Sequence, residues 1–213
     1  MSQPTAICPN CGASIRFRWS SAIQTTCEYC KSILVRDDVN LTKVGQVADL
    51  PPDISPIQIG TEGVYRDTAF QVIGRIIYSH DVGAWNEWHL MYSNGSSGWL
   101  SDSQAEYAVS FVSVPESPLP GPGEVYRGWE LTQQGVKLAV TVLTEASYEG
   151  VEGELPFQYW DKSKCRFADL RSNDGRFATI DYTENPPLLF LGEFVEFEAL
   201  RLVNLKEFEG WTA

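Results

Sequence analysis

Four of the five cysteines in this chain form two closely spaced pairs, and their spacing constrains the fold more than any other feature. Cys8 and Cys11 are separated by two residues, as are Cys27 and Cys30, and fifteen residues lie between the pairs. Two residues between thiols let the backbone turn with both sulfurs on one side, and two such turns supply four thiolates for a tetrahedral ion. The pattern predicts a zinc ribbon over residues 1–36, with Gly12 at a turn position of positive φ.

Other chemistries explain the four cysteines less well. A disulfide framework requires an oxidising compartment, and residues 1–5 show no basic stretch followed by an apolar segment. A catalytic dithiol accounts for one pair only, whereas iron on four sulfurs stays open as an alternative metal. Because four cysteine ligands leave no position for water, we expect the zinc to be structural. Cys165 lies far from both pairs and is predicted to be a small buried apolar residue.

Charge is distributed unevenly along the chain. The 213 residues carry a net charge of −12, yet residues 1–36 contain four basic side chains and one acidic one. An acidic protein of this kind is a poor coat for nucleic acid or anionic lipid. The basic residues of the ribbon either balance the negative zinc–thiolate centre or contact nucleic acid through Arg16 and Arg18. No apolar run reaches the ~20 residues of a membrane-spanning helix, so we expect a cytoplasmic protein.

Two proline-rich stretches divide the rest of the chain. Residues 49–58 contain three prolines, and residues 115–123 contain four prolines and two glycines. Proline lacks a backbone N–H donor and is excluded from helix and sheet interiors, so both stretches indicate boundaries. The predicted organisation is a zinc ribbon (1–36), a connector (37–58), a first β module (59–114), a Pro/Gly-rich linker (115–123) and a second β module (124–213).

Both modules show the alternation of apolar and polar residues that is typical of half-buried β-strands. The predicted strands contain residues 70–78, 88–92, 107–111, 138–142, 165–170, 177–182, 188–191 and 195–202. Asn94-Gly95 and Asn173-Asp174-Gly175 are hairpin-turn signals between such segments. The predicted fold class is therefore mainly β, a zinc ribbon followed by two small antiparallel β-barrel- or sandwich-like modules.

The densest group of chemically active side chains lies in the first module. Glu87 and His89 are two residues apart and share one face of a strand, and His80 precedes them, so acid–base catalysis on a small molecule is one hypothesis. The alternative places Trp85 and Trp88 in a core or groove, with Glu87 and His89 on a solvated face. Because the sequence contains no nucleophile elbow, phosphate loop or dinucleotide fingerprint, no catalytic residue is assigned.

Tryptophans beside turns favour a surface that binds a peptide or protein segment. Trp85 and Trp99 each lie next to a glycine-containing turn, and small β-barrels use such aromatic side chains to line grooves. The alternative is that they fill a small core. The predicted binding residues are Trp85, Glu87, Trp88, His89 and Trp99.

Several of these segments together resemble a known family. The stretches 60–65 (GTEGVY), 70–78 (FQVIGRIIY), 85–90 (WNEWHL) and 98–102 (GWLSD) are similar to the bacterial family called domain of unknown function 4178. The second module resembles the continuation found in such proteins, and an N-terminal zinc ribbon is a common companion. The family pattern more often has an aromatic or aliphatic residue where this chain has His89, which weakens a catalytic role for that histidine.

The resemblance implies little about activity. It implies a cytoplasmic adaptor in a membrane-stress or polyamine-related system, with indirect membrane association. Together with the closed zinc site and the aromatic turns, this makes a non-enzymatic interaction protein with a protein or peptide partner the leading hypothesis. A small-molecule enzyme using Glu87 with His80 or His89, and nucleic-acid binding through the ribbon, are the alternatives.

Overall fold

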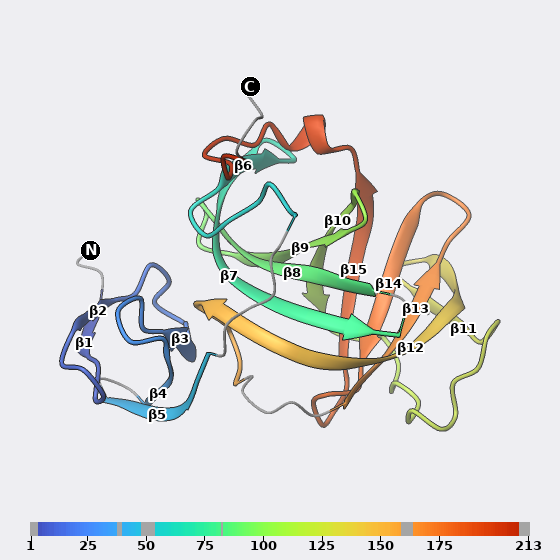
Figure 1. Ribbon diagram of the computed structural model, residues 1–213. Helices are drawn as coiled ribbons and strands as arrows, with labels where there is room; N and C mark the ends of the chain where they lie inside the picture. Colours follow the sequence, from blue (N-terminus) through green and yellow to red (C-terminus); the bar gives the residue numbers. More distant parts are fainter. Residues whose placement is uncertain (1–3, 38–39, 48–53, 82, 159–163, 209–213) are drawn as a thin grey trace.

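The computed structural model describes residues 4–37, 40–47, 54–81, 83–158 and 164–208, which form mainly antiparallel β-sheets. A small N-terminal ribbon lies beside a large curled sheet (Figure 1). The predicted mainly β fold with an N-terminal cysteine cluster is therefore confirmed. The one helix in the described residues is a short 3-10 turn, η1 (Phe197–Leu200), and no helix there is long and apolar enough to span a membrane.

The ribbon consists of two small sheets. β1 (Thr5–Ile7) pairs with β2 (Ser14–Arg16), and β3 (Gln24–Thr26), β4 (Ser32–Asp37) and β5 (Asn40–Gln46) form a second sheet. The predicted boundary at residue 36 is too early, because β5 lies in the predicted connector and pairs with β4 from Ser32↔Gln46 to Asp37↔Asn40. The ribbon needs this third strand because β4 has an otherwise unpaired edge opposite β3.

Ten further strands form one antiparallel sheet. Their bounds are β6 (Glu62–Tyr65), β7 (Thr68–His80), β8 (Gly83–Tyr92), β9 (Ser97–Ser103), β10 (Glu106–Ser113), β11 (Glu130–Gln133), β12 (Val136–Gly153), β13 (Lys164–Arg171), β14 (Arg176–Asp181) and β15 (Leu188–Val195). The order is β11-β12-β13-β14-β15-β10-β9-β8-β7-β6. The predicted hairpin turns lie where expected, with Gly95 between β8 and β9 and Gly175 between β13 and β14, both at positive φ.

The sheet closes on itself because β12 has two neighbours beyond β11. Its central part pairs with β13, from Ala139↔Arg171 to Ser147↔Lys164, and its last part pairs with β7, from Ser147↔Ser79 to Gly153↔Gly74. The eight strands from β7 through β10 and from β15 back to β12 thus form a closed ring. We call this ring, with its flanking strands β6 and β11, the barrel.

The two predicted β modules share this one barrel. β10 of the first range pairs with β15 of the second over seven residue pairs, and β7 pairs with β12. The proline-rich range 115–123 is a loop between β10 and β11, and its Leu119 packs against an outer hydrophobic cluster that includes Val125 and Leu131. Prolines in this loop cannot join the sheet's hydrogen-bond ladder, but they can cover its outer face.

The predicted strand over residues 195–202 is wrong beyond Val195. The ladder between β15 and β10 ends at Val195↔Tyr107, and the next pairing along the chain is the isolated bridge of Val203 with Glu62 of β6. The chain instead forms η1, which buries Leu200 against a second hydrophobic cluster and places the Phe197 ring 5.0 Å from the Tyr107 ring.

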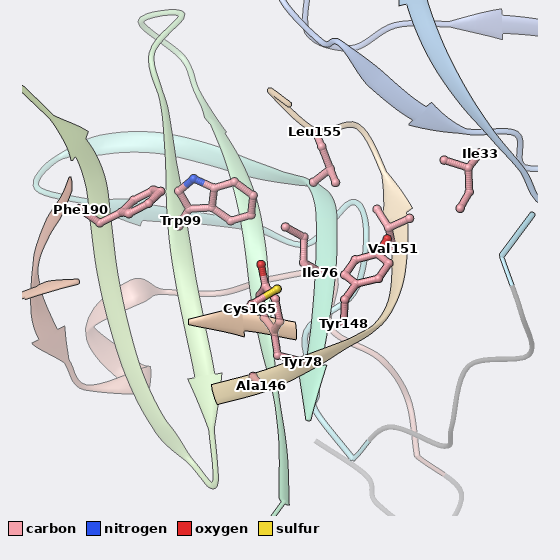
Figure 2. Packing of buried hydrophobic residues seen from close by; sticks show 10 residues of the cluster. All are labelled: Ile33, Ile76, Tyr78, Trp99, Ala146, Tyr148, Val151, Leu155, Cys165 and Phe190. Carbon is pink, nitrogen blue, oxygen red and sulfur yellow. The ribbon is translucent and has the colours of Figure 1, made fainter. Parts of the chain in front are cut away.

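The barrel interior holds a core of mixed aliphatic and aromatic residues. Figure 2 shows Ile76, Tyr78, Trp99 and Phe190 within the ring of strands, whereas Ile33 of the same cluster belongs to the ribbon. One continuous cluster therefore joins the ribbon to the barrel, and it includes Leu155, which follows β12.

Candidate functional site

The four paired cysteines come together within the ribbon. The Sγ atoms of Cys8 and Cys30 are 3.7 Å apart, those of Cys11 and Cys27 are 3.8 Å apart, and all four lie within 4.8 Å of one another. A tetrahedral ion with metal–sulfur bonds of about 2.3 Å requires sulfur–sulfur edges of about 3.8 Å. The four thiols therefore fit a single tetrahedral metal ion.

Two matching turns position these thiols. The backbone N–H of Gly12 donates to Cys8 O, and that of Lys31 donates to Cys27 O, both at 2.9 Å. Gly12 and Lys31, each directly after the second cysteine of its pair, have φ of 77° and 57°. The predicted positive φ of Gly12 is confirmed, and the second turn puts the same conformation on a lysine, which tolerates it at some cost in strain.

The ribbon is fixed to the barrel through Glu154 and Leu155, which we call the docking segment. The Glu154 carboxylate accepts hydrogen bonds from the backbone N–H groups of Arg18 at 2.7 Å and Trp19 at 2.9 Å. Leu155 forms an antiparallel bridge with Gln24 of β3, with its N–H donating to Gln24 O at 2.9 Å. Burial raises the pKa of the Glu154 carboxyl, whereas the two N–H donors oppose this shift.

His89 lies behind this contact rather than on a solvated face. Its side chain is fully buried, its Nδ1 lies 2.8 Å from Glu154 O, and its ring is 5.0 Å from the rings of both Trp19 and Trp99. The carbonyl acceptor requires the proton to be on Nδ1, and Nε2 has no hydrogen-bond partner within the described residues. His89 therefore belongs to the junction between the ribbon and the barrel.

A cavity of about 300 Å³ lies inside the barrel. Its wall is rich in aromatic side chains, of which Tyr78 and Trp85 stack with ring centroids 5.1 Å apart. Phe167 packs edge-on against both rings, at 5.3 Å and 6.2 Å. Trp99, stacked on Phe157 at 5.5 Å, also lines the cavity. The exposed residues Glu106 and Arg171 lie at its rim, so the cavity opens to solvent there.

Glu87 projects into this cavity from β8. Its carboxylate accepts hydrogen bonds from Ser101 Oγ at 2.9 and 2.7 Å and from Trp85 Nε1 at 3.0 Å. Burial raises the pKa of Glu87 to about 7 against these donors, and the negative charges of Asp169 and Asp181 add to the rise. A carboxyl group of this kind exchanges a proton near neutral pH.

Comparison with known proteins places the barrel in a family. A family model described as "Domain of unknown function (DUF4178)" matches residues 58–197, which span all ten strands of the barrel. The chain belongs to the DUF4178 family. The resemblance noted in the sequence is thus confirmed for the domain, and the match covers the first predicted β module and the second as far as residue 197. No curated protein and no solved structure matches the chain.

Two further acids of the DUF4178 domain, one half-buried and one buried, were not singled out in the sequence. Asp169 of β13 accepts a hydrogen bond from Thr179 Oγ1 at 2.7 Å, and Asp181 of β14 is 5% exposed. Both line the same cavity as Glu87. The sequence does contain a pattern that could have identified them: each acid follows an aromatic residue on its own strand at an even spacing. The pairs are Trp85 and Glu87, Phe167 and Asp169, and Phe177 and Asp181. In an alternating strand this spacing puts each acid on the face that carries the aromatic ring.

The structure separates the five predicted binding residues. Trp85, Glu87 and Trp99 line the cavity of the DUF4178 domain, whereas Trp88 and His89 do not. Trp88 is fully buried on the other face of β8, with the Arg75 guanidinium 4.7 Å from its ring centroid. His80, at the end of β7, lines the cavity and lies 5.5 Å from the Trp85 ring. Glu87 and His80 therefore share one site, and His89 lies outside it.

We expect His89 to make the stability of the DUF4178 domain depend on pH. Burial lowers the pKa of His89 to about 4, although the Glu154 carbonyl opposes this shift. Below about pH 6.5 the histidine is protonated in the unfolded chain but stays neutral in the folded protein. The free energy of unfolding therefore falls as the pH drops from about 6.5 to 4, by up to ~3 kcal/mol. The check is the unfolding free energy of wild type and His89→Gln across this range.

His89→Gln is the reference for the pH dependence because wild type and variant share every other titrating group, including the thiols and Glu87. We expect the stability difference between wild type and His89→Gln to shift by 1 kcal/mol or more between about pH 7 and 5. A constant difference would mean that His89 is protonated as readily in the folded protein as in the unfolded chain.

Proposed function

We propose that the protein binds a small molecule inside its barrel. The observation that carries this proposal is the aromatic cavity of about 300 Å³ within the closed ring of eight strands. Eight-stranded barrels are just wide enough to be filled by side chains or to hold one small ligand, and this volume is at the lower end for ligand sites. The rim at Glu106 and Arg171 offers a route for entry.

Filling the cavity is expected to abolish binding. Thr144 of β12 lines the cavity and Leu143, its neighbour, is 44% exposed, so Thr144→Trp blocks the site while Leu143→Trp adds the same bulk outside it. The measurement is a ligand-observed NMR screen of small aromatic and aliphatic compounds. We expect hits for wild type and Leu143→Trp, and a loss of at least tenfold in affinity for Thr144→Trp.

A second blocking variant distinguishes a filled cavity from misfolding of Thr144→Trp. Ser110→Phe enters the cavity from β10, on the opposite side of the ring from Thr144, and amide NMR spectra report whether each variant is folded. Hits that persist in two folded blocking variants would place binding outside the cavity, and an absence of hits for wild type would overturn the proposal.

Acid–base catalysis in the same cavity is a second candidate. It is supported by the pKa of Glu87, which lies near neutrality, and by the position of His80 beside Trp85, the residue that donates a hydrogen bond to Glu87. An enzyme would lose turnover in Glu87→Gln while a ligand still binds, because the Gln oxygen can accept from Ser101 as the carboxylate does.

We propose zinc as the metal of the four cysteines, in a structural role. The support is the fit of the sulfur–sulfur distances and the absence of a water position on an ion with four thiolate ligands. Bound there, the ion would hold the two turns of the ribbon together. The docking of a protein partner, contact with nucleic acid, a cytoplasmic location and a membrane-stress or polyamine-related role stay predictions from the sequence.

A further inference from the structure

The cavity concentrates negative charge in an aromatic enclosure. Glu87 enters from β8, and Asp169 and Asp181 enter from β13 and β14 on the far side of the ring. Within the described residues, Glu87 and Asp169 accept hydrogen bonds only from neutral groups, namely Ser101, Trp85 and Thr179. Half-buried carboxylates with only neutral partners keep an unbalanced charge, which a cationic guest would offset.

Among the described residues, little positive charge reaches Glu87 and Asp169. Arg171 is the one Lys or Arg among the described residues that line the cavity, and its guanidinium lies 4.4 Å from the ring centroid of Phe194 at the exposed rim. Its charge lowers the pKa of Asp169, yet burial outweighs it, and the net shift of that pKa is upward. The charge of Arg171 therefore does not offset the burial of the Asp169 carboxyl group.

A hydroxyl group in the same enclosure is free to contact a guest. Ser110 of β10 is 5% exposed as a residue and lines the cavity, and its side chain forms no hydrogen bond within the described residues, so its Oγ faces the cavity. A hydroxyl group that faces a cavity takes its hydrogen-bond partner from water or from a bound molecule. The hydrogen-bond partner of Ser110 would then be a polar group of the guest, or a water molecule that the guest displaces.

The spacing of the acids favours an organic cation over a metal ion. Among the described residues, the four cysteines are the one group of potential ligands close enough together to hold a metal, so the three carboxylates are too widely spread to share an ion. The stacked rings of Tyr78 and Trp85 adjoin Glu87, because Trp85 Nε1 donates to that carboxylate. Aromatic faces beside carboxylates bind organic ammonium groups through cation–π attraction and charge.

We propose that the barrel binds a small organic amine in its protonated form. Its ammonium group lies among Glu87, Asp169 and Asp181, and its apolar part packs against the Tyr78–Trp85 wall. This inference rests on the proposed function and specifies the chemical class of the ligand.

The test compares two probes of the same shape and different charge. Benzylamine is cationic at neutral pH, whereas benzyl alcohol is neutral, and both are small enough for a cavity of about 300 Å³. Titration of the full-length protein, followed by calorimetry and by the NMR signals of the tryptophan indole groups, gives the dissociation constant of each. We expect benzylamine to bind with a constant of about 1 mM or lower, at least tenfold more tightly than benzyl alcohol.

Three variants with the same change in net charge locate the effect. Asp169→Asn and Glu87→Gln keep oxygens that accept the existing hydrogen bonds but remove the negative charge, and each is expected to cut the preference for benzylamine at least fivefold. Asp174→Asn, at the exposed turn between β13 and β14, is the control and should leave the preference unchanged.

The outcomes separate this inference from the proposed function. If benzyl alcohol binds as tightly as benzylamine, or if Asp174→Asn lowers the preference as much as Asp169→Asn, the inference is overturned while small-molecule binding stands. If benzylamine fails to bind at about 10 mM, the inference is also overturned, and the compound screen with Thr144→Trp decides the proposed function by itself.

Discussion

Replacing Cys27 with Ser is expected to unfold the ribbon while the barrel stays folded. Cys27 is fully buried and supplies one of the four thiols, and binding of a structural zinc ion contributes about 10 kcal/mol to the folding of such small units. Without the ion, the short strands of the ribbon bury too little apolar surface to remain ordered. Hydrogen exchange should therefore lose protection throughout β1–β5.

Amides at the docking segment report whether the loss of protection extends from the ribbon to the barrel. Three N–H groups join the ribbon to the barrel, those of Arg18, Trp19 and Leu155, and they should lose their protection from hydrogen exchange together with the ribbon strands. The amides of β9 and β14 should stay protected. The control is Cys165→Ser, the same chemical change at a buried cysteine inside the barrel, which should retain one zinc per chain by elemental analysis. Ribbon amides that remain protected in metal-free Cys27→Ser protein would contradict the prediction.

Replacing Gly74 with Ala is expected to destabilise the protein by about 3 kcal/mol, through overpacking. A Cβ atom at this position would lie 2.1 Å from the carbonyl oxygen of Glu154 and 3.0 Å from Leu155 Cδ2. Gly74 pairs in register with Gly153 where β7 meets β12, so the contact is between backbones and neither strand can move without disturbing the docking segment. The measurement is the unfolding free energy from urea denaturation.

Gly123→Ala is the matched control for this variant. A Cβ atom there meets nothing within 4 Å, and the backbone of Gly123 does not have a positive φ. The control should be neutral or slightly stabilising, because alanine restricts the unfolded chain more than glycine does. Equal stability of the two variants would show that the docking segment can shift at little cost.

The sequence predicts the local structure well and the closure poorly. Alternation of apolar and polar residues marks β7, β8, β10 and β12 to β15, and the turns at Gly95 and Gly175 follow from their residue types. The cysteine spacing places the ribbon. These features depend on residues close together in the chain, and local preferences are sufficient to predict them.

The pairings of β10 with β15 and of β7 with β12 join residues far apart in the chain, and no local pattern specifies them. The proline-rich loop 115–123 therefore looked like a domain boundary. Glu87 was expected on a solvated face or in an acid–base pair, because a single strand does not tell which of its faces is enclosed. The structure places it inside, together with Asp169 and Asp181.

The closure of the barrel also sets how this chain can be cut and how it folds. A fragment ending in the loop after β10 would expose the edges of both β10 and β7, and exposed edges of that kind invite aggregation. We therefore expect neither the part before this loop nor the part after it to fold as a soluble fragment when expressed alone. During synthesis the first five barrel strands must wait until β12 and β15 emerge, so folding is dominated by long-range pairings and is expected to be slow.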